Sequence, residues 1–366
     1  MLVKKDIKKV IISDNADILT ALKKLNESSS KVLLVVDNID NQYRLKGTLT
    51  DGDIRRYILK TGKIEGYIKD IYHKDPVIIH ERNLYRNNTE EIKKLFYEKK
   101  IELLPIVDDY MNLVGYIEWS DLIREGEENF YEKIAEDIPV VIMAGGKGTR
   151  MRPFTEVLPK PLIPVGNKTA VEYIIDQFKK FGLNRFILTL NYKGELIEAY
   201  FNGIRKDYDV EFIWEDDFYG TAGSLKLVKD KVNTDFIVSN CDIIVKTDIK
   251  KVLDFHRDNN SYLTSITSIQ HYKIPYGVVI LKDGGKVDHI EEKPEYIFQI
   301  NTGVYILNKK SLDYIPEKKY YDMPSLIENL IKDGKNVYAY PINESDFIDL
   351  GQWDEYRKAL EKLVID

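Results

Sequence analysis

The stretch Ala144-Gly145-Gly146-Lys147-Gly148-Thr149-Arg150-Met151-Arg152-Pro153 decides how the second half of this chain folds. The apolar run Val140-Val141-Ile142-Met143 leads directly into it, and a short apolar run that ends in glycines predicts a buried strand. Glycines at the carboxyl end of a strand expose backbone N–H groups, which can surround a phosphate. Because Arg150, Arg152 and Lys160 add positive charge nearby, the sequence predicts a nucleoside triphosphate loop.

Taken alone, the loop is also compatible with other nucleotide-binding loops. It lacks the Gly-Lys-Ser/Thr ending of a P-loop, and no acidic residue follows a second strand about 20 residues further on, as in a dinucleotide-binding domain. A variant of either loop therefore stays open at this point, and the rest of the chain has to decide between them.

Composition limits the classes of protein to consider. A length of 366 residues predicts two or three domains. The formal net charge of −6 gives no general affinity for nucleic acid or for anionic membranes. Cys241 is the one cysteine, which excludes an intramolecular disulfide. Since no run of about 18 apolar residues occurs, we expect no transmembrane helix and a cytoplasmic protein.

The first third of the chain contains an internal repeat. Gly47-Thr48-Leu49-Thr50-Asp51-Gly52-Asp53-Ile54 resembles Gly115-Tyr116-Ile117-Glu118-Trp119-Ser120-Asp121-Leu122, 68 residues later. An amphipathic helix (residues 17–25 and 90–99) and an apolar strand (residues 32–37 and 103–108) precede each copy. The repeated unit is therefore helix, strand, turn, strand, helix, and such repeats define the architecture.

Residues 5–125 resemble a tandem pair of CBS domains, which bind adenine nucleotides and regulate an attached enzyme. The resemblance implies that a hydroxyl residue and an aspartate three positions later hold the nucleotide, here Thr50 and Asp53. The second copy keeps Asp121 but has Glu118 in place of the hydroxyl, and a carboxylate repels phosphate. We therefore expect one competent site. The alternative is that both aspartates only cap helices.

Domain boundaries follow from these patterns. We expect a first CBS domain at residues 1–62, a second at 63–125, a partly helical acidic linker at 126–137 and a separate domain at 138–366 that contains the glycine loop. CBS pairs usually associate with a second pair, so the resemblance also implies a homo-oligomer.

Strands and helices alternate after the glycine loop. We expect helices at residues 169–181, 195–201 and 221–228, and strands at 185–190, 209–214 and 235–238. This alternation predicts an α/β, Rossmann-like, doubly wound and mostly parallel sheet with ligands at the carboxyl ends of its strands. Beyond about residue 260 strands cluster, which predicts a mixed sheet.

Further motifs follow in order. Gly220-Thr221-Ala222-Gly223 is a second glycine turn, and Asp242 follows a buried strand, where a carboxylate can bind Mg²⁺ together with substrate phosphates. Glu291-Glu292-Lys293-Pro294 places carboxylates beside an ammonium group. Asn301-Thr302-Gly303-Val304-Tyr305 is expected to open a strand, and Asp349 to end one.

All these motifs in this order resemble the sugar-1-phosphate nucleotidylyltransferases, over residues 138–366. The resemblance implies that the nucleotide contacts Ala144, Gly145, Gly146, Gly148, Thr149, Gly220, Thr221, Ala222 and Gly223. It implies that Arg150, Lys160 and Lys293 neutralise phosphate charge, and that Asp242 and Asp349 hold Mg²⁺. The residues implied in the sugar pocket are Tyr276, Gly277, Glu292 and Asn301.

The chemistry is consistent with this inventory. The phosphate oxygen of a sugar 1-phosphate is already anionic, so it needs no general base to attack the α-phosphorus of a nucleotide. The requirement is to bring two polyanions together, which takes positive charge and positioning. The five histidines show no metal-ligand spacing, and we expect them at the surface or partly packed.

The fusion to a CBS pair most resembles the glucosamine-1-phosphate guanylyltransferases of bacterial nonulosonic (legionaminic) acid pathways, which use GTP. Other pairs stay open: mannose, heptose, glucose or N-acetylglucosamine 1-phosphate with GTP, UTP, CTP or dTTP. A catalytically silent nucleotide sensor is the alternative from another class.

Individual residues also have plainer interpretations. Asp242 could sit in a turn, Asp349 could cap the following helix, and Lys160 could be a solvated loop lysine. Lys293 could pair only with Glu291 or Glu292. We expect Cys241, Trp214 and Trp353 to pack in the core.

Overall fold

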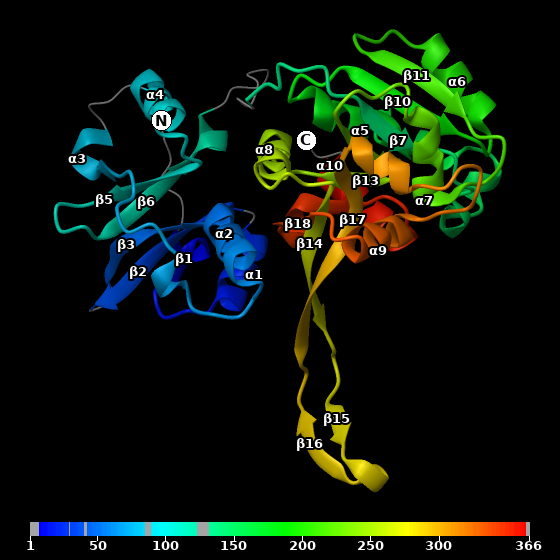
Figure 1. Cartoon of the computed structure of the whole chain (residues 1–366). Helices are drawn as coiled ribbons and strands as arrows, with labels where there is room; N and C mark the ends of the chain where they lie inside the picture. Colours follow the sequence, from blue (N-terminus) through cyan, green and yellow to red (C-terminus); the bar gives the residue numbers. More distant parts are fainter. Residues whose placement is uncertain (1–6, 29, 40–41, 85–88, 123–131, 364–366) are drawn as a thin grey trace. The chain divides into compact units, whose positions relative to one another are not determined.

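The computed structural model describes residues 7–28, 30–39, 42–84, 89–122 and 132–363. The chain in it divides into two units, Met1–Phe130 and Tyr131–Asp366 (Figure 1). No helix among the described residues is long and apolar enough to cross a membrane.

The first unit contains two three-stranded sheets of the same topology, as the repeat predicts. In each sheet the first two strands are parallel and the last two antiparallel. The first sheet comprises β1 (Ile11–Ser13), β2 (Val32–Ile39) and β3 (Gln42–Thr50), and the second comprises β4 (Ile79–His80), β5 (Leu103–Val107) and β6 (Leu113–Glu118). The helices are α1 (Ile18–Ser28), α2 (Asp51–Thr61), α3 (Glu81–Leu84) and α4 (Thr89–Lys99).

The two repeats share one core. Val32, Leu34 and Val36 of β2 pack in the same buried cluster as Leu103 and Val107 of β5. In addition, the backbone N–H of Leu45 donates to the carbonyl of Met111 at 3.0 Å. The second repeat has only a 3₁₀ turn, η3 (Trp119–Asp121), where the first has α2, and the helix expected after it lies outside the described residues.

The second unit is built on a seven-stranded sheet in the order β11-β10-β7-β12-β17-β14-β18. Only β17 runs against the others, so the sheet is mixed and mostly parallel, as predicted. Its strands are β7 (Val140–Met143), β10 (Arg185–Leu190), β11 (Asp209–Trp214), β12 (Asp235–Asn240), β14 (Leu263–Lys273), β17 (Glu295–Asn308) and β18 (Val337–Ile342).

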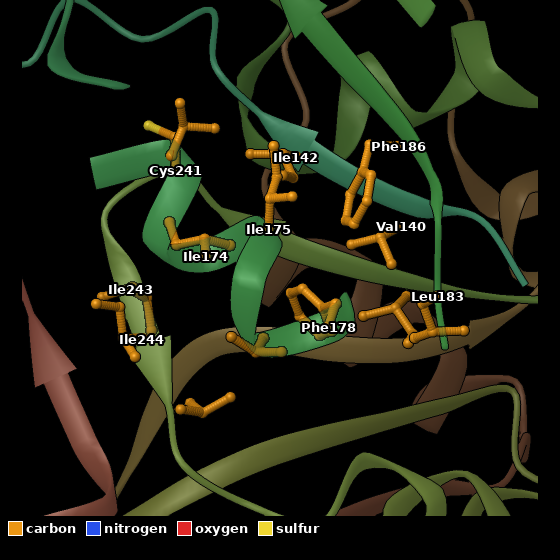
Figure 2. Packing of buried hydrophobic residues seen from close by; sticks show 14 of the residues in the cluster. Val140, Ile142, Ile174, Ile175, Phe178, Leu183, Phe186, Cys241, Ile243 and Ile244 are labelled. Carbon is orange, nitrogen blue, oxygen red and sulfur yellow. The ribbon is translucent and has the colours of Figure 1, made fainter. Parts of the chain in front are cut away.

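Helices cover both faces of this sheet because its central strands are apolar on both sides. Val140 and Ile142 of β7 pack on one face against Ile174, Ile175 and Phe178 of α5 (Ala170–Lys179), as Figure 2 shows. That face also carries α6 (Gly194–Gly203), α8 (Ile249–Asp258) and α10 (Trp353–Leu363). Val141, which points to the other face, packs with α7 (Gly220–Gly223), η7 (Ser224–Val228) and α9 (Met323–Lys332).

Small paired strands complete the unit. These are β8 (Pro164–Val165) with β9 (Lys168–Thr169), β13 (Ile243–Val245) with β19 (Phe347–Asp349), and β15 (Val278–Leu281) with β16 (Val287–Glu291). Strands β14 and β17 continue beyond the sheet as a two-stranded ribbon, and β15 and β16 lie at its far end (Figure 1).

Several local expectations were wrong. Asn301 lies inside β17 instead of opening a strand, whereas the helix predicted over 221–228 is present, α-helical in α7 and 3₁₀ in η7. His256 is fully buried and Trp214 is 43% exposed, the reverse of what we expected for each. Trp353 is half-buried, whereas Cys241 is buried as predicted.

The described end of the predicted linker packs on the second unit. Residues 126–131 lie outside the described part, and residues 132–137 are not helical. The N–H of Ile134 donates to the carbonyl of Phe181 at 2.7 Å, and Glu136 forms a bidentate ion pair with Arg257 at 2.8 and 2.7 Å.

Candidate active site

The strand order reverses at β7, with β10 and β11 on one side and β12 on the other. In open α/β sheets, ligands bind outside the carboxyl ends of the strands at such a switch point. The glycine loop follows Met143 at the end of β7, and Asp242 follows Asn240 at the end of the adjacent β12. The topology therefore places the two motifs at one edge of the sheet.

Hydrogen bonds fix both ends of the glycine loop. The N–H of Ala144 donates to the carbonyl of Thr189 at 3.0 Å, and the hydroxyl of Thr155 donates to the carbonyl of Gly148 at 2.9 Å. Gly148 has a φ of 61°, a conformation that favours glycine, and a Cβ there would meet Lys160. Gly146, Thr149 and Arg150 are exposed, so their backbone and the guanidinium group are accessible to a ligand.

Glu215 faces this loop, although motif reading missed it. It directly follows β11, and a Cβ on Gly145 would lie 2.8 Å from Glu215 Oε1 and 3.2 Å from Asn191 Cβ. The side-chain amide of Asn191 donates to the carbonyl of Glu215 at 3.1 Å. Burial raises the pKa of Glu215 to about 7 because it penalises the charged carboxylate. The rule that ligands bind at the carboxyl ends of parallel strands would have pointed to both residues.

Lys160, Asp242 and Asp349 converge beside Gly351. Lys160 and Asp242 form an ion pair, with each side chain only 12% exposed. A Cβ on Gly351 would overlap with Lys160 Nζ, Asp242 Oδ2 and Asp349 Oδ1. Only glycine therefore fits at position 351, and side chains from three separate parts of the chain meet beside it.

Asp349 is the last residue of β19 and also organises the turn that follows. Its Oδ1 accepts from the N–H of Gly351 at 2.6 Å, and its Oδ2 accepts from the side chain of Gln352 at 3.1 Å. The carboxylate of Asp349 does more than stabilise this turn, because it also faces Asp242 across Gly351. No cluster of three or more His, Cys, Asp or Glu ligands occurs among the described residues.

The second glycine turn is tied to the segment before α9. The N–H groups of Ala222 and Gly223 both donate to the carbonyl of Tyr321, at 3.0 and 2.9 Å, and Thr221 Oγ1 accepts from the N–H of Met323. Gly220 has a φ of 77°, and a Cβ there would meet Tyr321. Ala222 and Gly223 are buried. Of the four residues predicted to contact the nucleotide in this turn, Gly220 and Thr221 are therefore the ones that solvent or a ligand can reach.

The predicted sugar-pocket residues separate into two groups. Asn301 lies in the sheet, where it accepts from Ser265 Oγ at 3.1 Å and donates to the hydroxyl of Tyr305 at 2.6 Å. The adjacent Gly303 lies against the side chain of Asn240, at the end of β12. Asn301 is thus near the edge that carries Asp242.

The other group does not reach that edge within one chain, contrary to expectation. Tyr276, Gly277, Glu292 and Lys293 flank β15 and β16 at the far end of the ribbon (Figure 1). Lys293 is exposed and lies 3.8 Å from Glu292. A Cβ on Gly277 would meet Glu292 Oε2 at 3.1 Å, so these four residues form a second, remote cluster.

In the first unit, Thr50 and Asp53 form a capping box at the start of α2. Asp53 Oδ2 accepts from Thr50 Oγ1 at 2.6 Å and from the N–H of Thr50 at 2.8 Å. In the second repeat, Asp121 accepts in the same way from the N–H of Glu118 at 2.8 Å. Both aspartates therefore do cap, and Asp53 in addition pairs with Arg56.

Comparison with known proteins identifies the second unit. A model of the nucleotidyl transferase family matches residues 139–364. The chain belongs to this family. The CBS domain model matches residues 3–60 and 68–128, so the nucleotidyl transferase domain follows a tandem CBS pair.

Relatives of this nucleotidyl transferase domain act on different substrates. It is 30% identical over 226 residues to the D-glycero-alpha-D-manno-heptose 1-phosphate guanylyltransferase of Aneurinibacillus thermoaerophilus, covering 61% of this chain and 97% of that protein. It is 32% identical over 225 residues to the mannose-1-phosphate guanyltransferase of Saccharomyces cerevisiae, covering 58% and 61%, respectively. It is 30% identical over 244 residues to the UTP--glucose-1-phosphate uridylyltransferase of Synechocystis sp., covering 61% and 63%.

The chain thus spans about 60% of the length of the yeast and cyanobacterial relatives. Among solved structures, HddC from Yersinia pseudotuberculosis superimposes on 62% of this chain and 99% of its own, with 30% identity and a TM-score of 0.49.

Proposed function

We propose that this chain transfers a nucleoside monophosphate from a nucleoside triphosphate to a sugar 1-phosphate, releasing pyrophosphate. The observation that carries the proposal is the convergence of Lys160, Asp242 and Asp349 on Gly351, next to the glycine loop at the switch point of a nucleotidyl transferase fold. The arrangement has no nucleophilic Ser or Cys at its centre, because Cys241 is buried and burial raises the pKa of its thiol to about 12.

The reaction needs charge neutralisation more than proton transfer. A phosphate oxygen of the sugar 1-phosphate attacks the α-phosphorus, a new P–O bond forms, and the bond to the departing pyrophosphate breaks. The exposed glycine-loop N–H groups and Arg150 would bind the triphosphate. Lys160, one-eighth exposed and directed at the same edge, would stabilise charge on the reacting phosphates.

The two carboxylates fit one divalent cation. Asp242 and Asp349 face each other across Gly351, and the ammonium group of Lys160 pairs with Asp242. Mg²⁺ is usually bound by one or two carboxylates together with substrate phosphates, which agrees with a site of only two protein ligands. Bound there, Mg²⁺ would supply positive charge to the α-phosphate. Asp242 would then exchange its contact with Lys160 for one with the ion.

Glu215 supports guanine as the base. Guanine presents two adjacent donors, N1–H and N2–H₂, whereas uracil and thymine present one N–H between two carbonyls. A carboxylate accepts both guanine donors with its two oxygens, but it would oppose a pyrimidine carbonyl. Glu215 lies against Gly145, on the side of the loop that leads to the Gly220–Gly223 turn. Two of the three relatives named above are guanylyl-transferring enzymes, in agreement with GTP.

For the acceptor we propose glucosamine 1-phosphate. The support is the fusion of a CBS pair to this transferase, the arrangement that resembles the guanylyltransferases of nonulosonic acid pathways. Asn301 would contribute to the sugar pocket, since it lies beside the edge that carries Asp242.

For the CBS pair we propose adenine nucleotide binding at the first repeat. The hydroxyl of Thr50 and the carboxylate of Asp53 stand at the start of α2, beside Arg55 and Arg56. The second repeat offers Glu118 at the equivalent position, which opposes a phosphate.

A substrate panel tests the proposed reaction. Pyrophosphate release is measured with GTP, UTP, CTP, dTTP and ATP, each with glucosamine, N-acetylglucosamine, mannose, heptose and glucose 1-phosphates, with and without Mg²⁺. We expect the highest turnover with GTP and glucosamine 1-phosphate, and loss of turnover with EDTA. Tight GTP binding without turnover for any acceptor would instead identify a catalytically silent sensor.

A further inference from the structure

The ribbon formed by β14 and β17, together with β15 and β16 at its end, is here called the arm (residues 269–300). Strand β18 covers β14 only as far as Ser268, and β12 covers β17 only from Val304 onward. Beyond these points each strand of the arm has only the other as a partner, and the arm extends away from the sheet (Figure 1). From Asn301 to Glu295 alone the strand spans roughly 20 Å.

The arm exposes large apolar side chains. They are between 49% and 75% exposed: Tyr272, Tyr276, Val279, Leu281, Val287, Ile290 and Phe298. An isolated two-stranded hairpin is marginally stable in water, and apolar patches of this kind mark surfaces that contact another protein. The arm therefore has the composition of a segment that is covered in the assembled protein.

The direction of the arm is set within the second unit. Strands β14 and β17 pair continuously from Thr267 to Lys273 and from Asn301 to Glu295, and neither segment of the arm up to that point contains glycine or proline. Bending the arm back onto its own sheet would break this ladder, and each backbone group left without a partner has an energetic cost.

The base of the arm is also locked. A bulge opposite Ile266 contains Thr302 and Gly303. The hydroxyl of Thr302 donates to the carbonyl of Ile266 at 2.7 Å, and the N–H of Gly303 donates to Asn301 Oδ1 at 3.1 Å. Gly303 is further confined by the side chain of Asn240. The bulge is therefore a poor hinge, and a fold-back within one chain is disfavoured.

The remote cluster of Tyr276, Gly277, Glu292 and Lys293 lies midway along the arm, between the β14–β17 ribbon and the β15–β16 hairpin. Lys293 has a φ of 48°, an uncommon conformation for a residue with a side chain. Its side chain is exposed, and it lies 3.8 Å from the carboxylate of Glu292, which is exposed as well. A lysine presented in this way suits an anion brought by another molecule.

We propose that the arm of one copy of this chain docks on the nucleotidyl transferase unit of a second copy and places Lys293 at the partner's active site. This rests on the proposed function for the role of Lys293, which would contact the sugar phosphate. Lys160 lies at the sheet edge of each copy's own site, and Lys293 of the second copy would add the cation that contacts the sugar phosphate. Reciprocal exchange of arms about a two-fold axis completes both sites at once.

Complementation between two inactive variants tests the exchange. Lys293→Ala removes the cation that the arm supplies. Asp242→Ala removes a carboxylate from the rest of the nucleotidyl transferase unit, here called the body. Each variant alone should retain little turnover. Heterodimers, isolated through two different affinity tags, should regain about half of the wild-type turnover, because one of the two sites then combines an intact body with an intact arm. Heterodimers of Asp242→Ala with Lys160→Ala are the matched control and should stay inactive, since both changes lie in the body.

Heterodimers that stay as inactive as the control, or full turnover of Lys293→Ala alone, would overturn the exchange. A cross-linking experiment gives a readout that does not depend on activity. In a Cys241→Ala background, one chain carries Tyr276→Cys on the arm and the other carries Gly146→Cys on the glycine loop, which has open space around it.

Mild oxidation of the mixed chains should yield a covalent heterodimer on a non-reducing gel. A chain with Glu328→Cys on α9, in place of Gly146→Cys, should not cross-link. If a single chain carrying both Tyr276→Cys and Gly146→Cys instead closes an internal disulfide at high dilution, the arm serves its own site and the proposal fails.

Discussion

At the scale of single residues, Asp242 is the side chain on which the proposed chemistry depends most. It contacts Lys160, faces Asp349 across Gly351 and is almost buried. Asp242→Asn keeps the size of the side chain but removes its charge. We expect turnover to fall by about 100-fold or more, the scale of losing one main electrostatic stabiliser. Steady-state pyrophosphate release measures this, with Asp258→Asn, an exposed residue of α8, as the control. An unchanged rate in Asp242→Asn would remove Asp242 from the site.

Glu215 should decide the choice of base. Glu215→Gln replaces one acceptor oxygen by an amide donor, which opposes a guanine donor but suits a pyrimidine carbonyl. We expect kcat/KM for GTP to fall by about 10- to 100-fold, since one good base contact is worth about 1–3 kcal/mol. The ratio of GTP to UTP turnover is the measurement. Equal losses for both nucleotides would mean that Glu215 supports the fold of the loop and does not read the base.

Glu215 also predicts a pH dependence of binding. Burial raises its pKa to about 7 in the free protein, whereas guanine donors would favour the ionised form. Binding would therefore release a proton, and GTP affinity should rise as pH increases through about 7. Titration calorimetry from pH 6 to 8 checks this. Subtracting the profile of Glu215→Gln removes the titration of GTP itself, and identical profiles would contradict the prediction.

Site residues that belong to a motif could be predicted from the sequence, whereas residues that only lie next to them in space could not. Asp242 follows β12 and Asp349 ends β19, and the structure places both of them, with Lys160, around Gly351. Glu215 belongs to no motif, and only its position directly after β11 places it at the site. The remote position of Lys293 was not predictable either, because the direction of a hairpin depends on which strands cover it.

At the scale of elements, Arg257 joins three parts of the second unit. Located on α8, it donates from Nε to Asp235 Oδ2 of β12 at 2.9 Å and forms the bidentate pair with Glu136 that anchors residues 132–137. Arg257→Ala would leave the buried Asp235 without its main charge partner. We expect the free energy of unfolding to drop by about 3 kcal/mol, measured by urea denaturation. Lys229→Ala, which breaks an exposed pair with Asp313, is the control and should cost less than about 1 kcal/mol.

The same network predicts how stability depends on acidity. Burial alone would raise the pKa of Asp235, but the imidazole of His256, 3.7 Å away, and hydrogen bonds from Arg257 and Asn308 outweigh it and lower the pKa to about 2. A carboxyl group whose pKa is lower in the folded state stabilises the fold above its unfolded pKa of about 4. This contribution should disappear as pH falls from about 4 to 2. Urea denaturation of wild type and Asp235→Asn across that range tests it, because the two curves should converge at low pH.

Element types were predictable where local pattern and tertiary packing agree. The apolar runs at β10 and β11 match the predicted strands residue for residue. The helix predicted over 221–228 changes from α-helical to 3₁₀ geometry after Gly223, whose N–H donates to the carbonyl of Tyr321. His256 is buried because its Nδ1 lies 2.9 Å from the hydroxyl of Thr264, a partner that no local pattern reveals.

At the scale of the whole molecule, the CBS pair should bind nucleotide at one repeat only. A nucleotide at 100 times its Kd stabilises the folded form by about 2.7 kcal/mol, which is visible as a rise in Tm. We expect AMP, ADP or ATP to produce this rise in the wild type. Asp53→Ala should abolish it, whereas Asp121→Ala should preserve it. Both variants lose the equivalent capping box, so the comparison separates loss of a cap from loss of a ligand contact; a shift that persists in Asp53→Ala would place the site elsewhere.

Regulation of the nucleotidyl transferase unit would require that the two ligands affect each other's affinity. If adenine nucleotide at the first repeat changes GTP affinity by some factor, GTP must change the affinity for adenine nucleotide by the same factor, because the coupling free energy belongs to the pair of sites. We expect a factor of about 5–150, the range of ordinary allosteric coupling. Titrating each nucleotide in the absence and presence of the other measures both factors, and Asp53→Ala should reduce both to one. Two factors of one in the wild type would mean that the CBS pair is structural in this protein.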